Sequence, residues 1–562
     1  MFKESVINLL WKEVGISKEE INRLLEMPPQ EEMGDWALPC FELAKIMKKA
    51  PVKIAGDISS KLKNKLPKEI SSIKSVNGYV NFFINKDLLA TQIIKEILDK
   101  KEKYGSENMG DGEKVLVEHT SLNPNSEPHV GRARNAIIGD SIVRLLRFQN
   151  YEPEVHFYIN DVSKQVAIIA LGCKGNETLD EMLKIYIEMT KKVEKNAKLE
   201  QEVFKILSKI EEGDKKTIEK TEKIVEHAVK GQVKVLSHLG IKYDKFDFES
   251  EYIKAGQDLI EDFDKTGKLF KDKDGRFVLD ESGCELEKEM RAPMLVLTRS
   301  NGTGLYVLRD LAYNIEKLKK TQSNIIILGE EQKLYFKQLA IALDMINKLA
   351  PRVVHYSFVL IKTKEGKSKM STRRGEVVML KEFINEAIKK AKEEIAKRKS
   401  KGNAEEIAKA AIKYSMLKVD ENKNIVFDWE EALNFEGESG PYLQYSVARA
   451  NSILEKIKKE KKNNLKIKAS DKLKLGKEEI SLTKQLALFK NAVHEASKQL
   501  APHIIATYSY ELAKKFNEFY ATCPVMNAKG LQKSFRIELV RATIPVLENS
   551  LNILGISPIK KM

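Results

Sequence analysis

The residues best suited to chemistry lie where a predicted loop meets a predicted helix. The sequence His129-Val-Gly-Arg132 follows the loop 121–128 and opens a run in which apolar residues recur at helical spacing. Free amide N–H groups at the N-terminus of a helix attract anions, and Gly131 lets a ligand approach the backbone closely. This stretch therefore predicts a binding site for the phosphates of a nucleotide.

A second candidate stretch lies about 240 residues further along the chain. From Lys362 to Arg374 there are six cationic residues and one acid, Glu365. Gly366 lies within this stretch and Gly375 directly follows it, which suits a mobile loop that closes over a bound phosphate. An ordinary exposed basic loop is the alternative.

The strands of a parallel sheet are expected to hold these residues in place. One strand, at 114–120, precedes the loop, and a second, at 154–160, follows the helix. A strand, a helix and a strand joined this tightly form a right-handed parallel crossover, with the loop at the carboxyl edge of the sheet, where ligands bind. Residues 114–160 contain neither a G-x-G-x-x-G sequence nor a Walker lysine, so neither of the two common phosphate-binding loops is present there. Short apolar runs at 294–298 and 324–329 are expected to continue the same sheet.

The whole chain is predicted to hold three domains. Residues 1–108 form a small α/β domain, in which Asn77-Gly78 predicts a tight hairpin turn. Residues 109–400 form the nucleotide-binding domain, interrupted at about 165–250 by an insertion of Lys/Glu-rich helices to which no chemistry is assigned. Residues 401–562 are almost wholly helical in pattern. Two of their helices are expected at 485–500 and 535–551.

The composition is that of a large globular protein, and its net positive charge favours an anionic partner. Of 562 residues, 42% are hydrophobic and 32% are charged, and the formal net charge is +15. This excess favours a polyanion, although a lysine-rich surface alone explains much of it. The four cysteines are far apart and form no cluster of zinc spacing, so no metal site is expected. The N-terminus does not resemble a signal peptide, and no apolar run reaches the length of about 18 residues of a membrane span, so a cytoplasmic protein is expected.

Both candidate stretches resemble the signatures of a known enzyme class. His129-Val-Gly-Arg132 resembles the HIGH signature of class I aminoacyl-tRNA synthetases, and Lys369-Met-Ser-Thr-Arg-Arg-Gly375 resembles their KMSKS loop. The ordered pair is a more specific signal than either motif alone. Further stretches narrow the resemblance to arginyl-tRNA synthetases of the archaeal type. These are Glu118-His-Thr-Ser-Leu-Asn-Pro124, Tyr158-Ile-Asn-Asp161, Tyr306-Val-Leu-Arg-Asp310, Gly437-Glu-Ser-Gly-Pro-Tyr-Leu-Gln-Tyr445 and Leu539-Val-Arg-Ala542.

Two positions depart from the pattern of this family. Arg132 stands in place of the second histidine of HIGH, and Thr372 stands in place of the second lysine of KMSKS. Some family members compensate with a lysine just before HIGH, where this chain has Ser126. The missing charge is expected to come from Arg132 and the two arginines after Thr372. The alternative for Arg132 is a surface ion pair with an acid such as Glu127.

The resemblance implies the ligation of arginine to tRNA. ATP, with Mg²⁺ as its counter-ion, would activate L-arginine to arginyl-adenylate and release pyrophosphate, and arginine would then pass to the terminal adenosine of tRNA(Arg). A site that pairs the guanidinium group by hydrogen bonds needs no editing domain. The enzyme is expected to be a monomer without a membrane partner. The rival hypotheses are a HIGH-type nucleotidyltransferase for a small molecule and a non-catalytic tRNA-binding paralogue.

The resemblance also implies a fold of the α/β class. The catalytic domain would be a Rossmann-like parallel sheet with a helical insertion. The small N-terminal α/β domain would contact tRNA, and the all-α C-terminal domain would bind the anticodon.

Site residues follow from the chemistry and from the resemblance. A guanidinium group is best met by carboxylates, ideally in bidentate geometry. The residues expected at the arginine site are Glu118, Asn123, His129, Tyr306, Asp310 and Gln332. Those expected to bind ATP are Pro128, His129, Gly131, Asn135, Lys369 and Met370. Those expected to take part in catalysis are His129, Gly131, Arg132, Lys369, Ser371 and Arg373. Those expected to contact tRNA are Tyr79, Tyr442, Gln444, Tyr445 and Arg449.

Structural roles compete with some of these assignments. Asp310, expected at a junction between a strand and a helix, could cap the helix instead. Tyr442 and Tyr445 could stack on splayed bases, but packing between helices is an equally good use of both rings.

Overall fold

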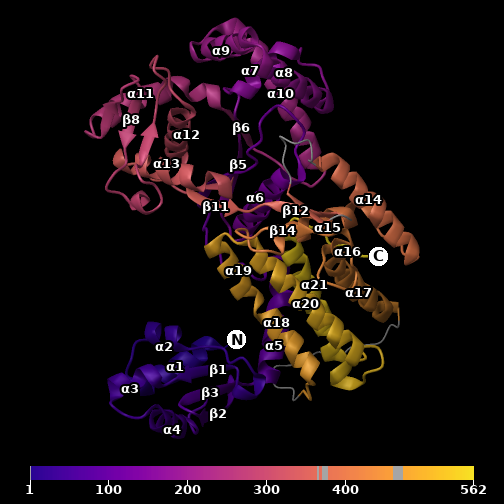
Figure 1. The fold of residues 1–562 in the computed structure, drawn as a ribbon. Helices are drawn as coiled ribbons and strands as arrows, with labels where there is room; N and C mark the ends of the chain where they lie inside the picture. Colours follow the sequence, from indigo (N-terminus) through magenta and orange to yellow (C-terminus); the bar gives the residue numbers. More distant parts are fainter. Residues whose placement is uncertain (1, 364–365, 370–377, 460–472) are drawn as a thin grey trace. The chain divides into compact units, whose positions relative to one another are not determined.

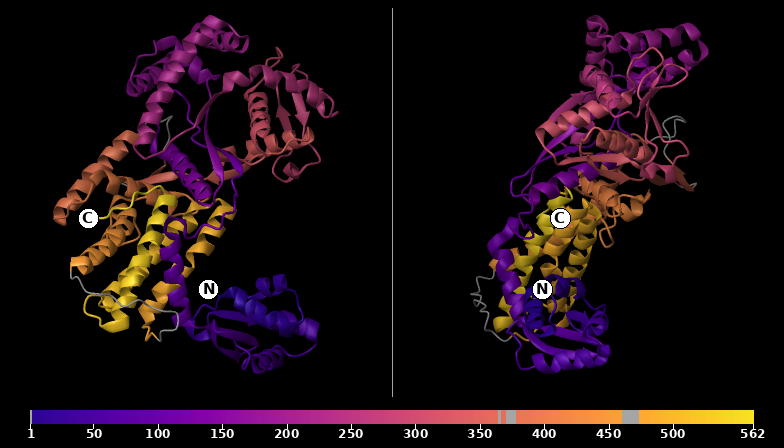
Figure 2. Two further views of the ribbon diagram at one scale, coloured as in Figure 1. Left: turned by 180° about the vertical axis from the view of Figure 1, so that it is seen from behind. Right: turned by 90° about the vertical axis from the view of Figure 1, so that its left-hand side faces the viewer.

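A computed structural model describes residues 2–363, 366–369, 378–459 and 473–562. The chain forms two compact units. The first comprises Met1–Gly105, Arg449–Asn491 and Glu511–Asn549, and the second comprises Ser106–Ala448, Ala492–Tyr510 and Ser550–Met562. The helices of the C-terminal region therefore contribute to both units. Figures 1 and 2 show the elements of each unit along the chain.

A three-stranded antiparallel sheet of order β1-β3-β2 organises the N-terminal part of the first unit. β2 (Ile70–Val76) and β3 (Tyr79–Ile84) form the hairpin that Asn77-Gly78 predicted. Both turn residues have positive φ, which a two-residue hairpin turn requires and which Asn and Gly tolerate best. β1 (Trp36–Pro39) pairs with β3 along its whole length. The predicted hairpin is confirmed.

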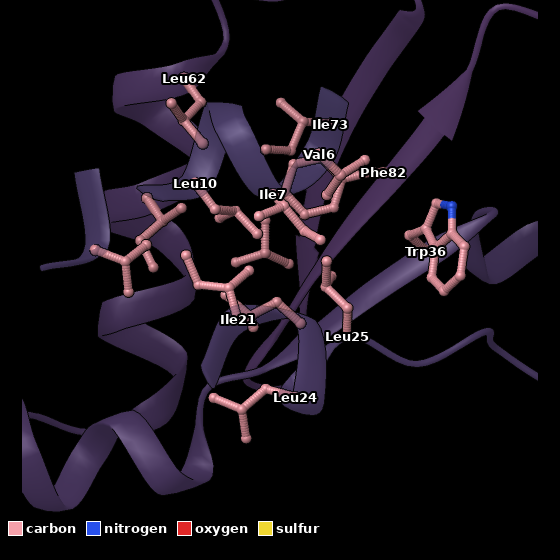
Figure 3. Packing of buried hydrophobic residues seen from close by; sticks show 14 of the residues in the cluster. Val6, Ile7, Leu10, Ile21, Leu24, Leu25, Trp36, Leu62, Ile73 and Phe82 are labelled. Carbon is pink, nitrogen blue, oxygen red and sulfur yellow. The ribbon is translucent and has the colours of Figure 1, made fainter. Parts of the chain in front are cut away.

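Helices cover this sheet with their apolar faces. They are α1 (Lys3–Val14), α2 (Lys18–Leu24), α3 (Phe41–Met47), α4 (Pro51–Leu62) and α5 (Lys86–Lys100). Figure 3 shows the resulting core, in which Val6 and Leu10 of α1 approach Ile21 of α2 and Phe82 of β3. Val6 and Leu10 are four residues apart and so lie on the same helix face.

The C-terminal region is helical, but its helices differ in length from those expected. They are α17 (Gly440–Lys459), α18 (Lys477–Ala487), α19 (Phe489–Gln499), α20 (Pro502–Thr522) and α21 (Gly530–Ile553). The single helix expected at 485–500 is wrong, because the chain breaks at Leu488 between α18 and α19. The helix expected at 535–551 lies inside α21. Within the first unit, α18 packs on α5.

A five-stranded sheet of order β11-β10-β4-β5-β6 organises the second unit, and all its neighbouring strands are parallel. The strands are β4 (Lys114–Glu118), β5 (Glu152–Ile159), β6 (Lys245–Phe248), β10 (Asn324–Gly329) and β11 (Arg352–Tyr356). α6 (Val130–Phe148) joins β4 to β5, which confirms the predicted crossover. The strand order reverses beside β4, and in such sheets the ligand site lies at the carboxyl end of the strands at that point.

The strand expected at 294–298 does not belong to this sheet. β9 (Met294–Val296) pairs with β8 (Phe277–Asp280), which pairs with β7 (Leu269–Lys271), in a separate antiparallel sheet. A short apolar run predicts a buried strand but not the sheet to which that strand belongs, because its residue pattern is the same in either sheet. The helices around this small sheet are α11 (Ile253–Asp264), α12 (Tyr306–Lys320) and α13 (Lys333–Met345).

The helical insertion lies between β5 and β6. Its helices are α7 (Lys164–Gly172), α8 (Leu179–Lys195), α9 (Ala197–Glu211) and α10 (Lys215–Ser237). Figure 1 shows them as one group, and buried residues such as Ile169 of α7 and Ile224 of α10 pack together inside it. β6 is already part of the main sheet, so the chain has returned from the insertion by residue 245.

A further small sheet of order β13-β12-β14 follows β11. Its strands are β12 (Val359–Thr363), β13 (Gly366–Lys369) and β14 (Ile425–Phe427). The nearby helices are α14 (Leu380–Lys397), α15 (Ala404–Leu417) and α16 (Trp429–Ala432), of which α14 and α15 pack against α6. A strand therefore occurs beyond residue 401, where the sequence predicted helices almost alone. Across the described residues, no helix is both long and apolar enough to cross a bilayer.

Candidate active site

A cavity of about 700 Å³ opens at the carboxyl edge of the main sheet. Its lining includes residues at the ends of β4, β5 and β10 and the start of α6, together with residues of α12. All six residues expected at the arginine site line it. They are Glu118, Asn123, His129, Tyr306, Asp310 and Gln332. The fold thus brings together side chains that are up to 214 residues apart in the sequence.

Asp310 is the most strongly oriented carboxylate of the cavity. It accepts hydrogen bonds from the hydroxyl groups of Tyr158 at 3.0 Å and Tyr335 at 2.5 Å. Burial raises the pKa of the Asp310 carboxyl to about 6. Asp310 is the fifth residue of α12, whose N-cap is Leu305, so it does not cap the helix. A carboxylate held by two phenols inside a cavity is suited to binding a cation.

Glu118, at the end of β4, differs from Asp310 because it already has a cationic partner. Its Oε2 accepts a hydrogen bond at 2.7 Å from Nζ of Lys317, and both side chains are buried. Lys317 follows Asp310 by seven residues in α12, so two turns of the helix place both on the same face. The ammonium group also lies 4.3 Å from the ring centroid of Tyr313. The charge of Glu118 is therefore balanced within the protein.

The other expected arginine ligands line the same cavity as Asp310. Tyr306, the first residue of α12, is 53% exposed, and its ring centroid lies 5.3 Å from that of Tyr335. Gln332 ends the short 3₁₀ helix η5 (Glu330–Gln332) and immediately precedes α13. Asn123 lies in the loop after β4. These side chains can adjust to a bound molecule.

His129 is the N-cap residue of α6, and its ring is neutral. Its Nδ1 accepts a hydrogen bond from the backbone N–H of Arg132 at 3.3 Å. Burial, followed by the charge of Arg132, lowers the pKa of His129 to about 4. The proton of the neutral ring therefore resides on Nε2, which can donate a hydrogen bond. A Cβ on Gly131 would lie 3.2 Å from the His129 ring, so glycine leaves that ring its position.

Arg132 lines the cavity with a partly exposed guanidinium group. Its Nη1 lies 3.4 Å from Oε1 of Glu331. Glu127, the acid suggested by the sequence, instead accepts a hydrogen bond from the backbone N–H of Lys381 at 2.7 Å. The partner of Arg132 is therefore an acid some 200 residues away in the chain, near Gln332.

Backbone contacts hold both ends of the KMSKS-like stretch. β13 ends at Lys369 and pairs with β12, with Lys369 opposite Leu360. After the stretch, Val378 accepts a hydrogen bond from the N–H of Val130 at 3.1 Å, and the N–H of Leu380 donates to the carbonyl of Pro128 at 2.8 Å. Pro128 itself is not among the cavity residues. Met370, Ser371, Arg373 and the departure at Thr372 lie outside the described residues.

Asn135 is not part of the cavity, unlike the sequence expectation. Its side chain is buried and accepts a hydrogen bond from the N–H of Thr120 at 2.6 Å, while its Nδ2 donates to the carbonyl of Ile327 at 2.8 Å. Thr120 has a φ of 70°, which is unusual for a β-branched residue. Asn135 therefore ties the end of β4 to β10, and its polar atoms are already used by the protein.

The expected tRNA contacts are divided between the two units. Tyr79 begins β3 and packs edge-on against Phe41, with ring centroids 5.3 Å apart. The ring of Tyr442 lies 5.8 Å from that of Tyr510. The guanidinium group of Arg449 bonds Asn517 and lies 5.2 Å from the ring centroid of Tyr520. Tyr445 is half-buried on α17.

Gln444 departs from its expected role. It is fully buried, and its amide nitrogen donates to the carbonyls of Glu406 at 3.3 Å and Ser557 at 2.9 Å. A side chain enclosed in this way holds protein segments together and does not face RNA. Helical spacing could have indicated this, because Gln444 lies three residues before Val447 and four before Ala448, both buried.

Sequence reasoning missed several residues of the cavity. Tyr158 belongs to a stretch used for the resemblance, but its bond to Asp310 was not anticipated. Lys317 could have been found from its helical spacing to Asp310. Tyr335 carried no comparable signal, because it follows a different strand and its partner is 25 residues away.

Comparison with known proteins assigns the chain to a class of enzymes. Residues 93–429 match the model of the catalytic domain of class I (R) tRNA synthetases, 1–84 that of the arginyl tRNA synthetase N terminal domain, and 443–562 that of the DALR anticodon binding domain. The catalytic model covers more than half of the chain. The fold and the cavity are thus those of a class I aminoacyl-tRNA synthetase.

Individual relatives narrow this class. The arginine–tRNA ligase of Methanocaldococcus jannaschii is 38% identical over 99% of both chains, and that of Clostridium perfringens is 35% identical over 100% of both. The structure of Thermus thermophilus arginyl-tRNA synthetase matches with a TM-score of 0.79 at 26% identity, covering 100% of this chain and 99% of that one. The chain belongs to the arginyl-tRNA synthetase family.

Proposed function

We propose that this chain is an arginine–tRNA ligase whose cavity binds arginine and ATP, forms arginyl-adenylate and releases pyrophosphate, after which arginine passes to the terminal adenosine of tRNA(Arg). The observation that carries the proposal is the pairing of two features in one cavity. A preoriented carboxylate, Asp310, lies at one end, and the N-terminus of α6 with His129 lies at the other. The first suits a guanidinium group and the second suits phosphates.

Asp310 is the proposed partner of the arginine side chain. The guanidinium group would meet the carboxylate that Tyr158 and Tyr335 hold in place. Tyr306 would cover it from the entrance, and Gln332 would contact the remainder of the amino acid together with Asn123. Glu118 would contact the guanidinium group through its Oε1, because its Oε2 is bonded to Lys317. An analogue without a guanidinium group would leave these buried polar groups unpaired, which gives strong discrimination.

The phosphate end would stabilise the negative charge that builds up when the arginine carboxylate attacks the α-phosphate. The proposed donors are Nε2–H of His129 and the backbone N–H of Gly131. The neighbouring N–H groups of Val130 and Arg132 already donate within the protein, to Val378 and to His129. Arg132 would supply a cation beside them. We also propose roles for Lys369, Met370, Ser371 and Arg373 of the KMSKS-like stretch in binding ATP and its leaving pyrophosphate.

Mg²⁺ is proposed to arrive with ATP. In the described ranges, no three His, Cys, Asp or Glu side chains cluster as a protein-held metal site requires. Bound to the nucleotide phosphates, Mg²⁺ would neutralise part of their charge.

For tRNA we propose contacts from Tyr79, Tyr442, Tyr445 and Arg449, and none from the buried Gln444. Aromatic rings stack on splayed bases, and an arginine can bind phosphate. The tRNA-binding role of the N-terminal and C-terminal regions, the monomeric state and the cytoplasmic location stay predictions.

The proposal is tested by ATP–pyrophosphate exchange with each of the twenty amino acids, with and without tRNA. Arginine alone should support exchange, and the same enzyme should then charge tRNA(Arg) with labelled arginine. Exchange supported by a different small molecule would favour the nucleotidyltransferase hypothesis. Binding of tRNA without exchange under either condition would favour the non-catalytic paralogue.

A further inference from the structure

The helical insertion, to which the sequence assigned no chemistry, contacts the loop that leads to His129. Gln232 of α10 is only 1% exposed, and its Nε2 donates to the carbonyl oxygens of Asn123 at 2.9 Å and Ser126 at 2.8 Å. A second inserted helix, α7, contributes Gln165, whose Oε1 accepts a hydrogen bond from Nδ2 of Asn125 at 3.1 Å. Two inserted helices thus hold the middle of the loop 121–128.

The contacts of Gln232 fix the direction of its amide. Both of its loop partners are carbonyl oxygens, which only accept hydrogen bonds, so the nitrogen must face the loop. The oxygen, Oε1, then faces away from the loop. It is buried and has no hydrogen-bond partner in the described part of the chain, and Gln232 is one of the residues that line the cavity. A buried acceptor without a donor is unfavourable until a donor reaches it.

We infer that Gln232 is a positioning residue of the arginine site. Its nitrogen fixes the loop so that Asn123 faces the cavity. In this way the insertion acts on the substrate through the loop. The inference rests on the proposed function, because it takes arginine as the molecule that Asn123 meets.

Two variants of Gln232 separate the functions of its amide. Gln232→Met keeps the length of the side chain but removes both the donor and the acceptor. Gln232→Lys keeps a donor for the two carbonyls and removes the acceptor. Gln201→Met is the matched control, because Gln201 is exposed on α9 of the same insertion.

The first measurement is the KM for arginine and for ATP in pyrophosphate exchange. For Gln232→Met the KM for arginine should rise about 10-fold or more, as the loss of two neutral hydrogen bonds implies, while the KM for ATP changes little. Gln232→Lys should lie between this variant and wild type. Gln201→Met should match wild type.

The second measurement does not depend on activity. Hydrogen exchange of the backbone amides in residues 121–135 should accelerate in Gln232→Met and return toward the wild-type rate in Gln232→Lys. An unchanged KM for arginine in Gln232→Met, an equal rise in both KM values, or no recovery in Gln232→Lys would each overturn the inference. Absence of arginine-dependent exchange in the wild type would instead contradict the proposed function.

Discussion

The two ends of the cavity are constructed differently. At the amino-acid end, each carboxylate is held by side chains from the protein: Asp310 by two tyrosine hydroxyls, and Glu118 by Lys317. At the phosphate end, the proposed groups are the backbone N–H of Gly131, a neutral histidine and the partly exposed Arg132, whose ion pair with Glu331 is 3.4 Å long.

The two ends therefore suit different parts of the reaction. A guanidinium group has a fixed shape, so a rigid and desolvated carboxylate recognises it well. Negative charge builds up on the phosphate oxygens during the reaction, and N–H donors and a cation already directed at those oxygens stabilise it. Specificity is therefore expected to depend on the first end, and rate on the second.

The largest effect is expected at Asp310. Asp310→Asn keeps the shape of the side chain but removes the charge that would pair with the guanidinium group, so the KM for arginine should rise about 100-fold or more. The KM for ATP should stay near the wild-type value. Steady-state exchange kinetics with each substrate varied in turn measure both, with the exposed Asp258→Asn of α11 as the control. An equal rise in both KM values would show that Asp310 has a structural role.

The pair of Glu118 and Lys317 should affect stability more than recognition. Lys317→Met leaves a buried carboxylate without its partner, which typically costs about 3–5 kcal/mol of unfolding free energy. The double variant Glu118→Gln with Lys317→Met removes both charges and should recover much of this loss. Urea unfolding of the single and double variants measures the recovery. If Glu118→Gln instead raised the KM for arginine as much as Asp310→Asn does, the two carboxylates would be equivalent and the contrast between them would fail.

A smaller effect is expected at Arg132, at the phosphate end. Arg132→Ala should lower the rate of arginine activation about 10-fold, the size of one charge-assisted hydrogen bond. Arg132→His should lose less, because imidazole still donates, and Arg132→Lys should lie between wild type and alanine. Glu331→Gln removes the acid that Arg132 pairs with and should not lower the rate. Exchange at saturating arginine with tRNA present measures all four variants, and a wild-type rate in Arg132→Ala would remove Arg132 from the proposed phosphate site.

The smallest expected effect is a dependence of the KM for arginine on pH, which should arise only at the amino-acid end of the cavity. Because burial raises the pKa of Asp310 to about 6, lowering the pH through 6 protonates the carboxylate of the free enzyme and weakens arginine binding. Between pH 6.5 and 5.5 the ionised fraction falls about threefold, and the KM for arginine should rise by the same factor. The pKa of His129, lowered to about 4, keeps its ring neutral over this range, so the KM for ATP should not follow. In Asp310→Asn the dependence on pH should disappear, and its persistence there would assign it to another group.

Much of the fold was predictable because its signals are local. The hairpin at Asn77-Gly78 and the strand, loop and helix around His129 depend on the conformations that a few adjacent residues prefer. The gathering of Glu118 and His129 at one edge also follows from the sequence, because a parallel sheet places the carboxyl ends of its strands at the same edge. The position of Asp310 does not follow in this way, because α12 comes after β9, which belongs to the separate antiparallel sheet. The roles of these side chains in binding stay predictions.

Most helices and strands, the class of fold and the family resemblance of the motifs could be predicted from the sequence. The tertiary structure alone decided the partners: Lys317 for Glu118 across 199 residues, Tyr335 for Asp310, and Gln232 for the loop beside His129. It also decided that β9 joins a separate sheet and that Asn135 and Gln444 are enclosed by backbone carbonyls and amides. The physical reason is that helical and strand periodicity depend on neighbours in the chain, whereas a buried polar atom is satisfied by whichever group the folded chain brings within about 3 Å of it.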